Sequence, residues 1–264
     1  MLTLYHFTGA TCAAKVLLAL AEKQIPFEDR LLERKYLSSA EFRALNPNGV
    51  VPVITHKGAT ILESSVILNY LEDAFTGIEL RPTDAQYRAQ MNYWLKLVDD
   101  SLMDLGTVTY AIFARVEYLQ MSRVERELYY QSIPNFQIRE SRRNAIELGL
   151  NAPEVSDAVR GLCDLQRKAE TMLGDNSYLA SSFSLADIAL TPFVHRLDAL
   201  GLLATRAELP GFHRWWDTIR ARRSFQDAIV SRIPGVLLRD LRAAADSNSA
   251  AIACLRKQSL LANS

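Results

Sequence analysis

The 264-residue sequence is poor in cysteine and carries no excess of either charge. Its three cysteines, Cys12, Cys163 and Cys254, lie far apart with no Cys-x-x-Cys pair, so neither a zinc cluster nor a disulfide framework is predicted. Thirty Lys and Arg residues balance thirty Asp and Glu residues, which removes the electrostatic reason to expect nucleic acid or an anionic membrane as a partner. We expect a reducing, cytoplasmic location and a small-molecule or protein partner.

Long hydrophobic runs are also missing. No apolar stretch approaches the ~20 residues that cross a bilayer, and the first residues lack the features of a signal peptide. Hydrophobic residues nevertheless make up 49% of the chain, so a large core can form and disorder is excluded as the main state. The four histidines show no metal-ligand spacing, and we expect no metal. A soluble globular protein is predicted.

The first part of the chain alternates strand and helix signals. Strand formers at Leu2–Phe7 lead through a turn into the helical run Ala13–Lys23, which Pro26 terminates, and Phe27–Leu32 reads as a second strand. After a polar stretch, two more strands and a helix are predicted at 50–55, 59–62 and 63–73, with a glycine-containing hairpin turn between the two strands. This order predicts a small α/β domain.

Strand signals nearly vanish after the break at Gly77–Thr83, and helical periodicity dominates to about Phe225. We therefore predict two domains, 1–78 and an all-helical 83–264. The tail is predicted to hold a weak helix at 236–245 and then a mobile Ser/Ala/Asn-rich patch.

Two segments of the helical part stand out. Residues 122–152 are unusually polar and are predicted to leave the helical bundle. Ser184–Asp187 has the pattern of a capping box, in which the serine accepts the N3 amide and the aspartate reaches back to the serine. Such a box indicates only where a helix begins.

Two local features suit a small, peptide-like anion. Pro52 removes a hydrogen-bond donor from a strand, which a cis Val51–Pro52 bond explains if Val51 presents its backbone to a ligand; an edge-strand proline is the alternative. Glu63 and Ser64 open a helix directly after a strand, and the free amides of a helix N-terminus suit a carboxylate. An ordinary helix cap explains the same pair.

Three segments, in this order and spacing, resemble the glutathione transferase superfamily: Asn46–Ile54 (NPNGVVPVI), Glu63–Leu71 (ESSVILNYL) and Ser184–Ile188 (SLADI). The resemblance covers about residues 2–230. It implies an α/β N-terminal thioredoxin-like domain that holds glutathione, followed by an all-α C-terminal helical domain with the second-substrate pocket, in a homodimer. Weaker similarity at 91–99 and 139–144 points to the bacterial glutathione-dependent β-aryl-etherases.

The resemblance also assigns residues to glutathione. In the family the Val-Pro bond is cis and the Glu-Ser pair holds the γ-glutamyl end of glutathione, which carries over to Val51, Pro52, Glu63 and Ser64. Lys35 stands where members often place a basic residue on the glycine carboxylate, and a solvated loop lysine is the alternative.

The residue that activates the glutathione thiol departs from the family pattern. The positions used for a catalytic Ser or Cys fall on Ala10, which cannot donate, or on Thr11, whose hydroxyl can. Cys12 can hydrogen-bond or form a mixed disulfide with glutathione, and a buried small hydrophobe is the alternative. We therefore predict Thr11 and Cys12 as the catalytic candidates.

We predict a glutathione transferase whose thiolate attacks a hydrophobic, aromatic electrophile, with β-aryl ethers as the favoured substrates. The alternatives are thiol–disulfide or glutathionyl-lyase chemistry through Cys12, and a glutathione-binding module without catalysis. Aromatic residues predicted near the second-substrate pocket, with core packing as the alternative, are Trp94, Tyr110, Phe113 and Tyr118. Arg139, Arg142 and Arg143 either contact anionic or phenolic groups there or form a solvated helix face.

Overall fold

The computed structural model describes residues 1–261, and their packing divides the chain into two compact units. Unit 1 comprises residues 1–96, 172–193 and 213–234. Unit 2 comprises residues 97–171, 194–212 and the described residues from Gly235 on. The α/β part followed by helices is confirmed, because the four strands end by Ile61 and the elements from Ala85 to Leu261 are helices. The predicted domain limits, 78 and 83, stay a prediction.

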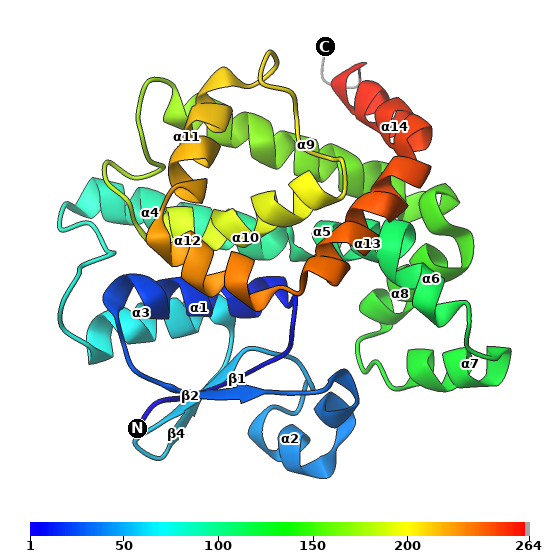
Figure 1. Cartoon of the computed structure of the whole chain (residues 1–264), viewed down its shortest axis with the longest axis horizontal. Helices are drawn as coiled ribbons and strands as arrows, with labels where there is room; N and C mark the ends of the chain where they lie inside the picture. The colour runs from blue at the N-terminus through cyan, green and yellow to red at the C-terminus, as the bar shows by residue number, and fades with distance from the viewer. Residues whose placement is uncertain (262–264) are drawn as a thin grey trace. The chain divides into compact units, whose positions relative to one another are not determined.

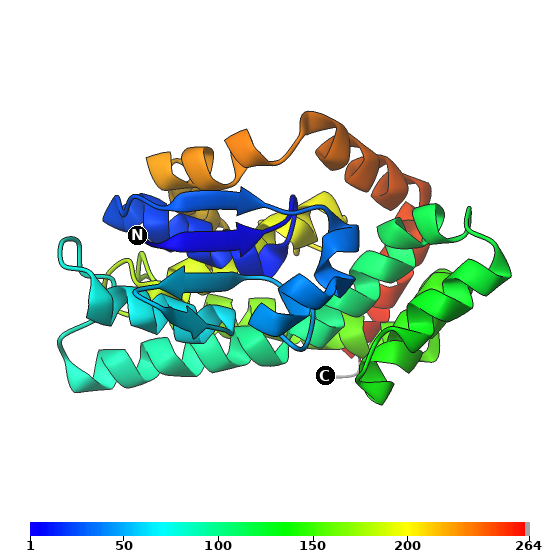
Figure 2. The same cartoon turned by 90° about the horizontal axis from the view of Figure 1, so that it is seen from below.

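Unit 1 contains a four-stranded sheet with the order β2-β1-β3-β4. β1 (Thr3–His6) runs parallel to β2 (Glu28–Leu31) and antiparallel to β3 (Val53–His56), which pairs antiparallel with β4 (Ala59–Ile61). Figure 2 shows β1 and β2 pointing the same way. All four strand predictions are confirmed, with ends shifted by a few residues.

Two long helices of unit 1 follow β1 and β4 in the chain (Figure 1). α1 (Thr11–Lys23) and α3 (Ser64–Ala74) pack against each other, and the apolar positions that repeat at helical spacing in both, such as Val16 and Ile67, are fully buried. The helices predicted at 13–23 and 63–73 are therefore confirmed. A short helix, α12 (Arg223–Ala228), also packs on α1.

The polar stretch after β2 contains two elements that the pattern did not predict, the 3-10 helix η1 (Arg34–Ser38) and α2 (Ala40–Leu45). Ser39 caps α2 by accepting a hydrogen bond from the Phe42 amide at 3.2 Å, and the Phe42 side chain is fully buried. One buried apolar residue in six gives no periodic signal, which explains the omission.

The remaining elements are helical. Helices that contribute residues to both units are α4 (Ala85–Asp100), α9 (Pro153–Leu173), α10 (Leu185–Ala199) and α11 (Pro210–Arg220). Unit 1 also contains the 3-10 helix η4 (Val230–Arg232). Unit 2 contains α5 (Leu102–Thr109), the π-helical turn η2 (Tyr110–Ala114), α6 (Arg115–Tyr118), α7 (Arg123–Gln131), α8 (Phe136–Leu148), the 3-10 turn η3 (Gly149–Asn151), α13 (Gly235–Ser247) and α14 (Ser249–Leu261).

Two expectations for unit 2 are corrected. The polar segment 122–152 does not leave the helical fold, because its helices α7 and α8 pack on each other and bury Tyr130 and Ile146 in one apolar cluster. The Ser/Ala/Asn-rich patch, predicted to be mobile, is the start of α14, whose Ile252 is buried. Alanine is the strongest helix former, and three alanines lie in the first five residues of α14, so a prediction made from the serines and asparagine was wrong. The last residues of the chain, 262–264, lie outside the described residues.

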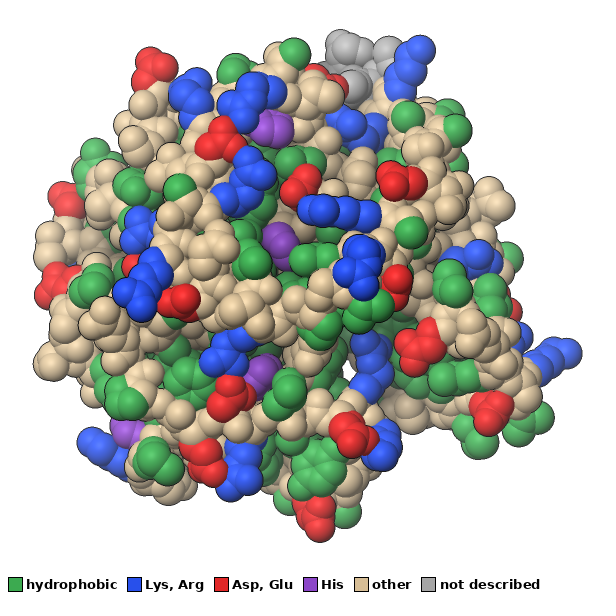
Figure 3. Space-filling view, viewed as in Figure 1, with side chains coloured by type: hydrophobic (Ala, Val, Ile, Leu, Met, Phe, Trp, Pro, Cys, Tyr) green, Lys and Arg blue, Asp and Glu red, His purple; other side chains and the backbone are tan. Residues whose placement is uncertain are grey.

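The surface of the described chain carries both charges intermixed. On the face seen in Figure 3, Lys and Arg side chains alternate with Asp and Glu over the whole view. Among residues 1–261, no helix combines the length and the apolarity that crossing a bilayer requires.

Candidate functional site

The register of the sheet brings four chain segments of unit 1 to one edge. Tyr5 pairs with Val53 and Ile54 pairs with Ile61, so the ends of β1 and β4 lie beside the start of β3. β2 runs parallel to β1, and its end therefore lies at the same edge (Figure 2). All the predicted site residues follow or precede these strand ends: Thr11 and Cys12, Lys35, Val51 and Pro52, and Glu63 and Ser64.

The segment before β3 is held in one conformation from within. The buried Asn46 side chain donates to the Val50 carbonyl at 2.7 Å and accepts from the Asn48 amide at 3.1 Å. Gly49 has a φ of +63°, and a Cβ there would lie 2.9 Å from the Leu37 carbonyl oxygen, so only glycine fits. These contacts explain the NPNG part of the motif.

The Val51–Pro52 peptide bond is cis, as the resemblance implies. Pro52 is buried, Val51 is half-buried, and the strand ladder begins only at Val53. The backbone of Val51 therefore precedes the paired part of β3, where a ligand strand can pair with it.

The N-terminus of α3 is left open by its own side chains. Glu63, the N-cap residue, is exposed, has a φ of +65° and forms no capping hydrogen bond through its side chain. A non-glycine residue at positive φ is uncommon, and such residues concentrate at binding sites. Ser64 is 6% exposed, and the buried Oγ of Ser65 has no hydrogen-bond partner among the described residues. Sequence reasoning missed Ser65, because Ser64 is the residue that the family motif names.

The N-terminus of α1 is open in the same way. Its N-cap residue, Ala10, has no side chain that can cap, and no acidic residue lies in the first turn. Thr11 is the first helical residue and Cys12, the second, is half-buried. The Thr11 hydroxyl forms no hydrogen bond with any residue from 1 to 261, so it is available to a ligand. The helix N-terminus adds positive potential beside it.

Lys35 differs from the other predicted residues. Its side chain is 84% exposed and pairs with Glu33 at 2.7 Å, which matches the solvated loop lysine given as the alternative. Its role at the glycine carboxylate stays a prediction.

The capping-box prediction at α10 is confirmed in one half and wrong in the other. The Asp187 carboxylate reaches back to accept from the Ser184 amide at 3.0 Å, but the Ser184 hydroxyl oxygen accepts from Ala186, the N2 residue, at 3.3 Å. Asp187 also accepts from the Leu179 amide at 3.1 Å and from Trp215 Nε1 at 2.8 Å. Burial raises the pKa of Asp187 to about 6 despite these donors.

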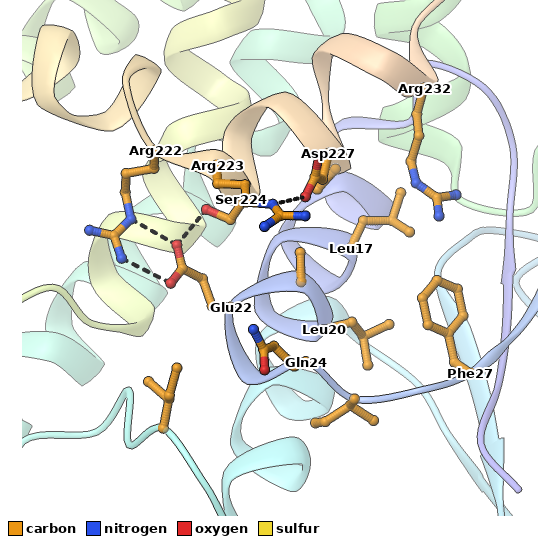
Figure 4. Close-up of a pocket in the computed structure, with 14 residues that line it drawn as sticks. Leu17, Leu20, Glu22, Gln24, Phe27, Arg222, Arg223, Ser224, Asp227 and Arg232 are labelled. Atoms are coloured by element: carbon orange, nitrogen blue, oxygen red, sulfur yellow. Dashed lines mark hydrogen bonds and ion pairs between the residues drawn. The ribbon is translucent and has the colours of Figure 1, made fainter.

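A pocket of about 610 Å³ in unit 1 lies away from this edge, between the second half of α1 and α12 (Figure 4). The Arg222 guanidinium donates to both oxygens of Glu22, at 2.7 and 2.9 Å, and the Ser224 hydroxyl donates to Glu22 as well. Arg223 pairs with Asp227. These charged groups neutralise each other, and none of the predicted site residues lines the pocket.

The aromatic residues predicted for the second-substrate pocket are divided between the two units. Trp94 belongs to unit 1 and is core, with 1% of its surface exposed, whereas Tyr110, Phe113 and Tyr118 belong to unit 2. Tyr118 is also buried, and Tyr110 and Phe113 are half-buried around it. Core packing, the alternative, is therefore correct for Trp94 and Tyr118.

The three arginines of α8 contact carboxylates or aromatic rings. Arg143 donates to both oxygens of Glu127, at 2.6 and 2.9 Å. Arg142 lies 3.7 Å from the centre of the Tyr110 ring, and Arg139 lies 5.5 Å from that of Phe136. The expectation of a solvated helix face is wrong at Arg142, because its guanidinium packs on the ring of Tyr110, which lies far away in the sequence.

Comparison with known proteins identifies the family. Residues 11–74 match the model of the glutathione S-transferase N-terminal domain, and residues 167–217 match that of the C-terminal domain. Protein LigF of Sphingobium sp. strain SYK-6 is 30% identical over 240 residues, which cover 86% of this chain and 92% of LigF. The chain belongs to the glutathione S-transferase family, and its reaction class is that of a glutathione-dependent transferase.

Other relatives extend the similarity. The tetrachloro-p-hydroquinone reductive dehalogenase of Sphingobium chlorophenolicum is 25% identical, over 86% of this chain and 95% of its own. The glutathione S-transferase GstB of Escherichia coli is 26% identical, over 87% of this chain and 98% of GstB. The crystal structure of the β-etherase LigF superposes with a TM-score of 0.78 at 29% identity, over 87% of this chain and 99% of LigF.

Proposed function

We propose that the chain binds glutathione at the sheet edge of unit 1 and that the bound thiolate attacks a hydrophobic aromatic electrophile, with β-aryl ethers as the favoured substrates. The observation that carries this proposal is that two helix N-termini without side-chain caps, those of α1 and α3, and the segment that precedes β3 all adjoin one edge of the sheet. Similarity to a β-etherase and to a dehalogenase of a chlorinated hydroquinone supports an aromatic second substrate.

Each predicted residue has a definite part in this proposal. Val51 pairs its backbone N–H and C=O with the cysteinyl unit of glutathione, as an added strand would, next to Pro52. Glu63 and Ser64 hold the γ-glutamyl end, where the carboxylate meets the free amides of α3. Lys35 reaches the glycine carboxylate after leaving Glu33.

Thr11 is proposed to activate the thiol. A hydroxyl that donates to the sulfur stabilises the thiolate over the thiol, and the N-terminus of α1 adds positive potential, so both lower the pKa of the bound thiol. The thiolate then attacks the electrophilic carbon, the carbon–sulfur bond forms, and the leaving group departs with the bonding electron pair. Cys12 has no step in this reaction.

A panel of three substrates tests the proposal. Chlorodinitrobenzene, a β-aryl ether and hydroxyethyl disulfide are each offered with glutathione, and we expect turnover of the first two. Thr11→Val should slow transfer by about ten- to a hundredfold at neutral pH, because a hydrogen bond to a charged group contributes roughly 1.5–3 kcal/mol. Cys12→Ala is the matched control on the same helical turn and should retain transferase activity.

The other outcomes discriminate the alternatives. Turnover of the disulfide alone, abolished by Cys12→Ala, would establish thiol–disulfide or glutathionyl-lyase chemistry through Cys12 instead. No turnover together with glutathione binding would establish a binding module without catalysis. Full activity in both Thr11→Val and Cys12→Ala would assign thiol activation to another group.

We also propose a homodimer in the cytoplasm with a role in detoxification. Zero formal net charge offers little self-repulsion against association, and three cysteines that lie far apart in the sequence suit a reducing compartment. Light scattering at micromolar protein tests the dimer, and a monomer of 29.7 kDa would contradict it.

A further inference from the structure

Unit 2 contains a guanidinium group that is packed among aromatic rings. The guanidinium carbon Cζ of Arg142 lies 3.7 Å from the centre of the Tyr110 ring, and the Nη1 atom of Arg142 donates to the Tyr129 hydroxyl at 2.9 Å. Tyr118 completes the cluster, with its ring centre 4.5 Å from that of Tyr129 and 5.8 Å from that of Tyr110. We call these four residues the Arg142 cluster.

Within residues 1–261, Arg142 pairs with no carboxylate, unlike the nearby arginines. Among the described residues, Arg143 pairs with Glu127 at 2.6 Å and Arg126 pairs with Glu147 at 2.8 Å, but no such pair involves Arg142. A charge that leaves water without a counter-ion is costly, and proteins normally pair it. The packing of unit 2 therefore leaves one positive charge for an anion from outside.

The hydroxyl that Arg142 contacts does not replace that anion. Burial raises the pKa of Tyr129 well above its usual value, so its hydroxyl stays protonated and neutral at neutral pH. One N–H of the guanidinium is used by Tyr129, which leaves others for a ligand. Tyr110, Tyr129 and Arg142 are each half-buried, so part of each side chain remains exposed to solvent.

The backbone at Tyr110 supports a binding role. Tyr110 opens the π-helical turn η2 (Tyr110–Ala114), which interrupts the helix between α5 and α6. Such turns are rare and concentrate at functional sites, because the widened turn redirects the side chains that it carries. Here the turn carries the ring against which Arg142 stacks.

We propose that the Arg142 cluster binds an aromatic carboxylate and so selects second substrates that carry one. The planar guanidinium matches a carboxylate with two parallel hydrogen bonds, and the rings of Tyr110 and Tyr129 offer apolar surface to an aromatic ring beside it. The selection of substrates rests on the proposed function, whereas binding of an aromatic carboxylate does not require turnover.

Binding of an unreactive pair of probes tests the site. Calorimetry without glutathione compares 3-phenylpropanoate with the uncharged 3-phenylpropanamide, which has nearly the same shape. We expect the wild-type chain to bind the carboxylate about tenfold or more tightly than the amide. Arg142→Gln should abolish this preference. Arg139→Gln on the same helix, next to Phe136 and Glu140, is the matched control and should retain it.

Two results would overturn the site: equal affinity of the wild-type chain for both probes, or a preference that survives Arg142→Gln. The wild-type comparison needs no variant, so the test stands even if Arg142→Gln does not fold. A chain that shows the preference but transfers glutathione to no electrophile would refute the proposed function and leave the site. A chain that transfers glutathione but binds both probes equally would refute the carboxylate site and leave the proposed function standing.

Discussion

The N-termini of α10 and α3 carry the same types of side chain, serine and a carboxylate, but only at α10 do these side chains satisfy the amides. Asp187 is fully buried and accepts hydrogen bonds from its own helix, from Leu179 and from Trp215. At α3, Glu63 is exposed at positive φ and caps nothing, while Ser65 Oγ is buried without a described partner.

The difference separates a structural helix end from one that can bind a ligand. Where every donor has an acceptor in the chain, a polar cluster contributes to stability and has no capacity left for a ligand. Where donors are free at a helix N-terminus, an anion can bind there. Substitutions at α10 should therefore change folding, and substitutions at α3 should change affinity.

The largest effect is expected from Asp187→Ala. Removing the carboxylate leaves the buried donors of Leu179, Ser184 and Trp215 without an acceptor, and the free energy of unfolding should fall by about 4 kcal/mol. Urea denaturation measures it. The matched control, Glu63→Ala at the open helix, should change stability by less than about 0.5 kcal/mol. Equal effects of the two substitutions would erase the contrast.

The pH dependence of stability sharpens the contrast further. The pKa of Asp187 is about 6 in the folded chain and about 4 in an unfolded one, so the folded state holds this proton more tightly. The raised pKa adds about 3 kcal/mol to the free energy of unfolding while Asp187 is protonated. This contribution is complete below about pH 4 and is lost as the pH rises through about 6. The difference between wild type and Asp187→Asn, followed by denaturation across this range, should show it; parallel curves would contradict it.

A smaller effect is expected from Ser64→Ala at the open helix. Loss of one hydrogen bond to the charged end of glutathione should weaken binding by about 1–2 kcal/mol in calorimetry, with little loss of stability. Ser184→Ala is the matched control at the closed helix: it should reduce stability by about 1 kcal/mol and leave glutathione affinity unchanged. Unchanged affinity in Ser64→Ala would remove this serine from the site.

Local patterns predicted much of unit 1. Short apolar runs predicted the strands, and the apolar spacing of 13–23 and 63–73 predicted α1 and α3. Both patterns can be recognised within a short stretch of sequence, without knowledge of distant contacts. α2 was missed because one buried residue, Phe42, carries its packing. The start of α14 was misread because serine and asparagine are also common in loops.

The candidate site could be predicted only where a motif carries it. The cis bond at Val51 and the helix start at Ser64 belong to contiguous motifs, and the structure places both at one sheet edge. Ser65 and the Arg142 cluster had no such signal. Arg142 reads as one more charge in a charged run, and nothing nearby in sequence indicates that Glu127 pairs with Arg143 while Arg142 meets Tyr110.

The sequence by itself determined the order of strands and helices, the motifs at the sheet edge and the family, since all three depend on residue types at short spacing. The tertiary structure alone decided that Asp187 accepts from Trp215, that Trp94 is core and that Arg142 meets Tyr129 and Tyr110 rather than a carboxylate of the described chain. The physical reason is that a polar group is defined by its partner: whether it stabilises the fold or remains free for a ligand depends on residues far away in the chain, which only folding brings into contact.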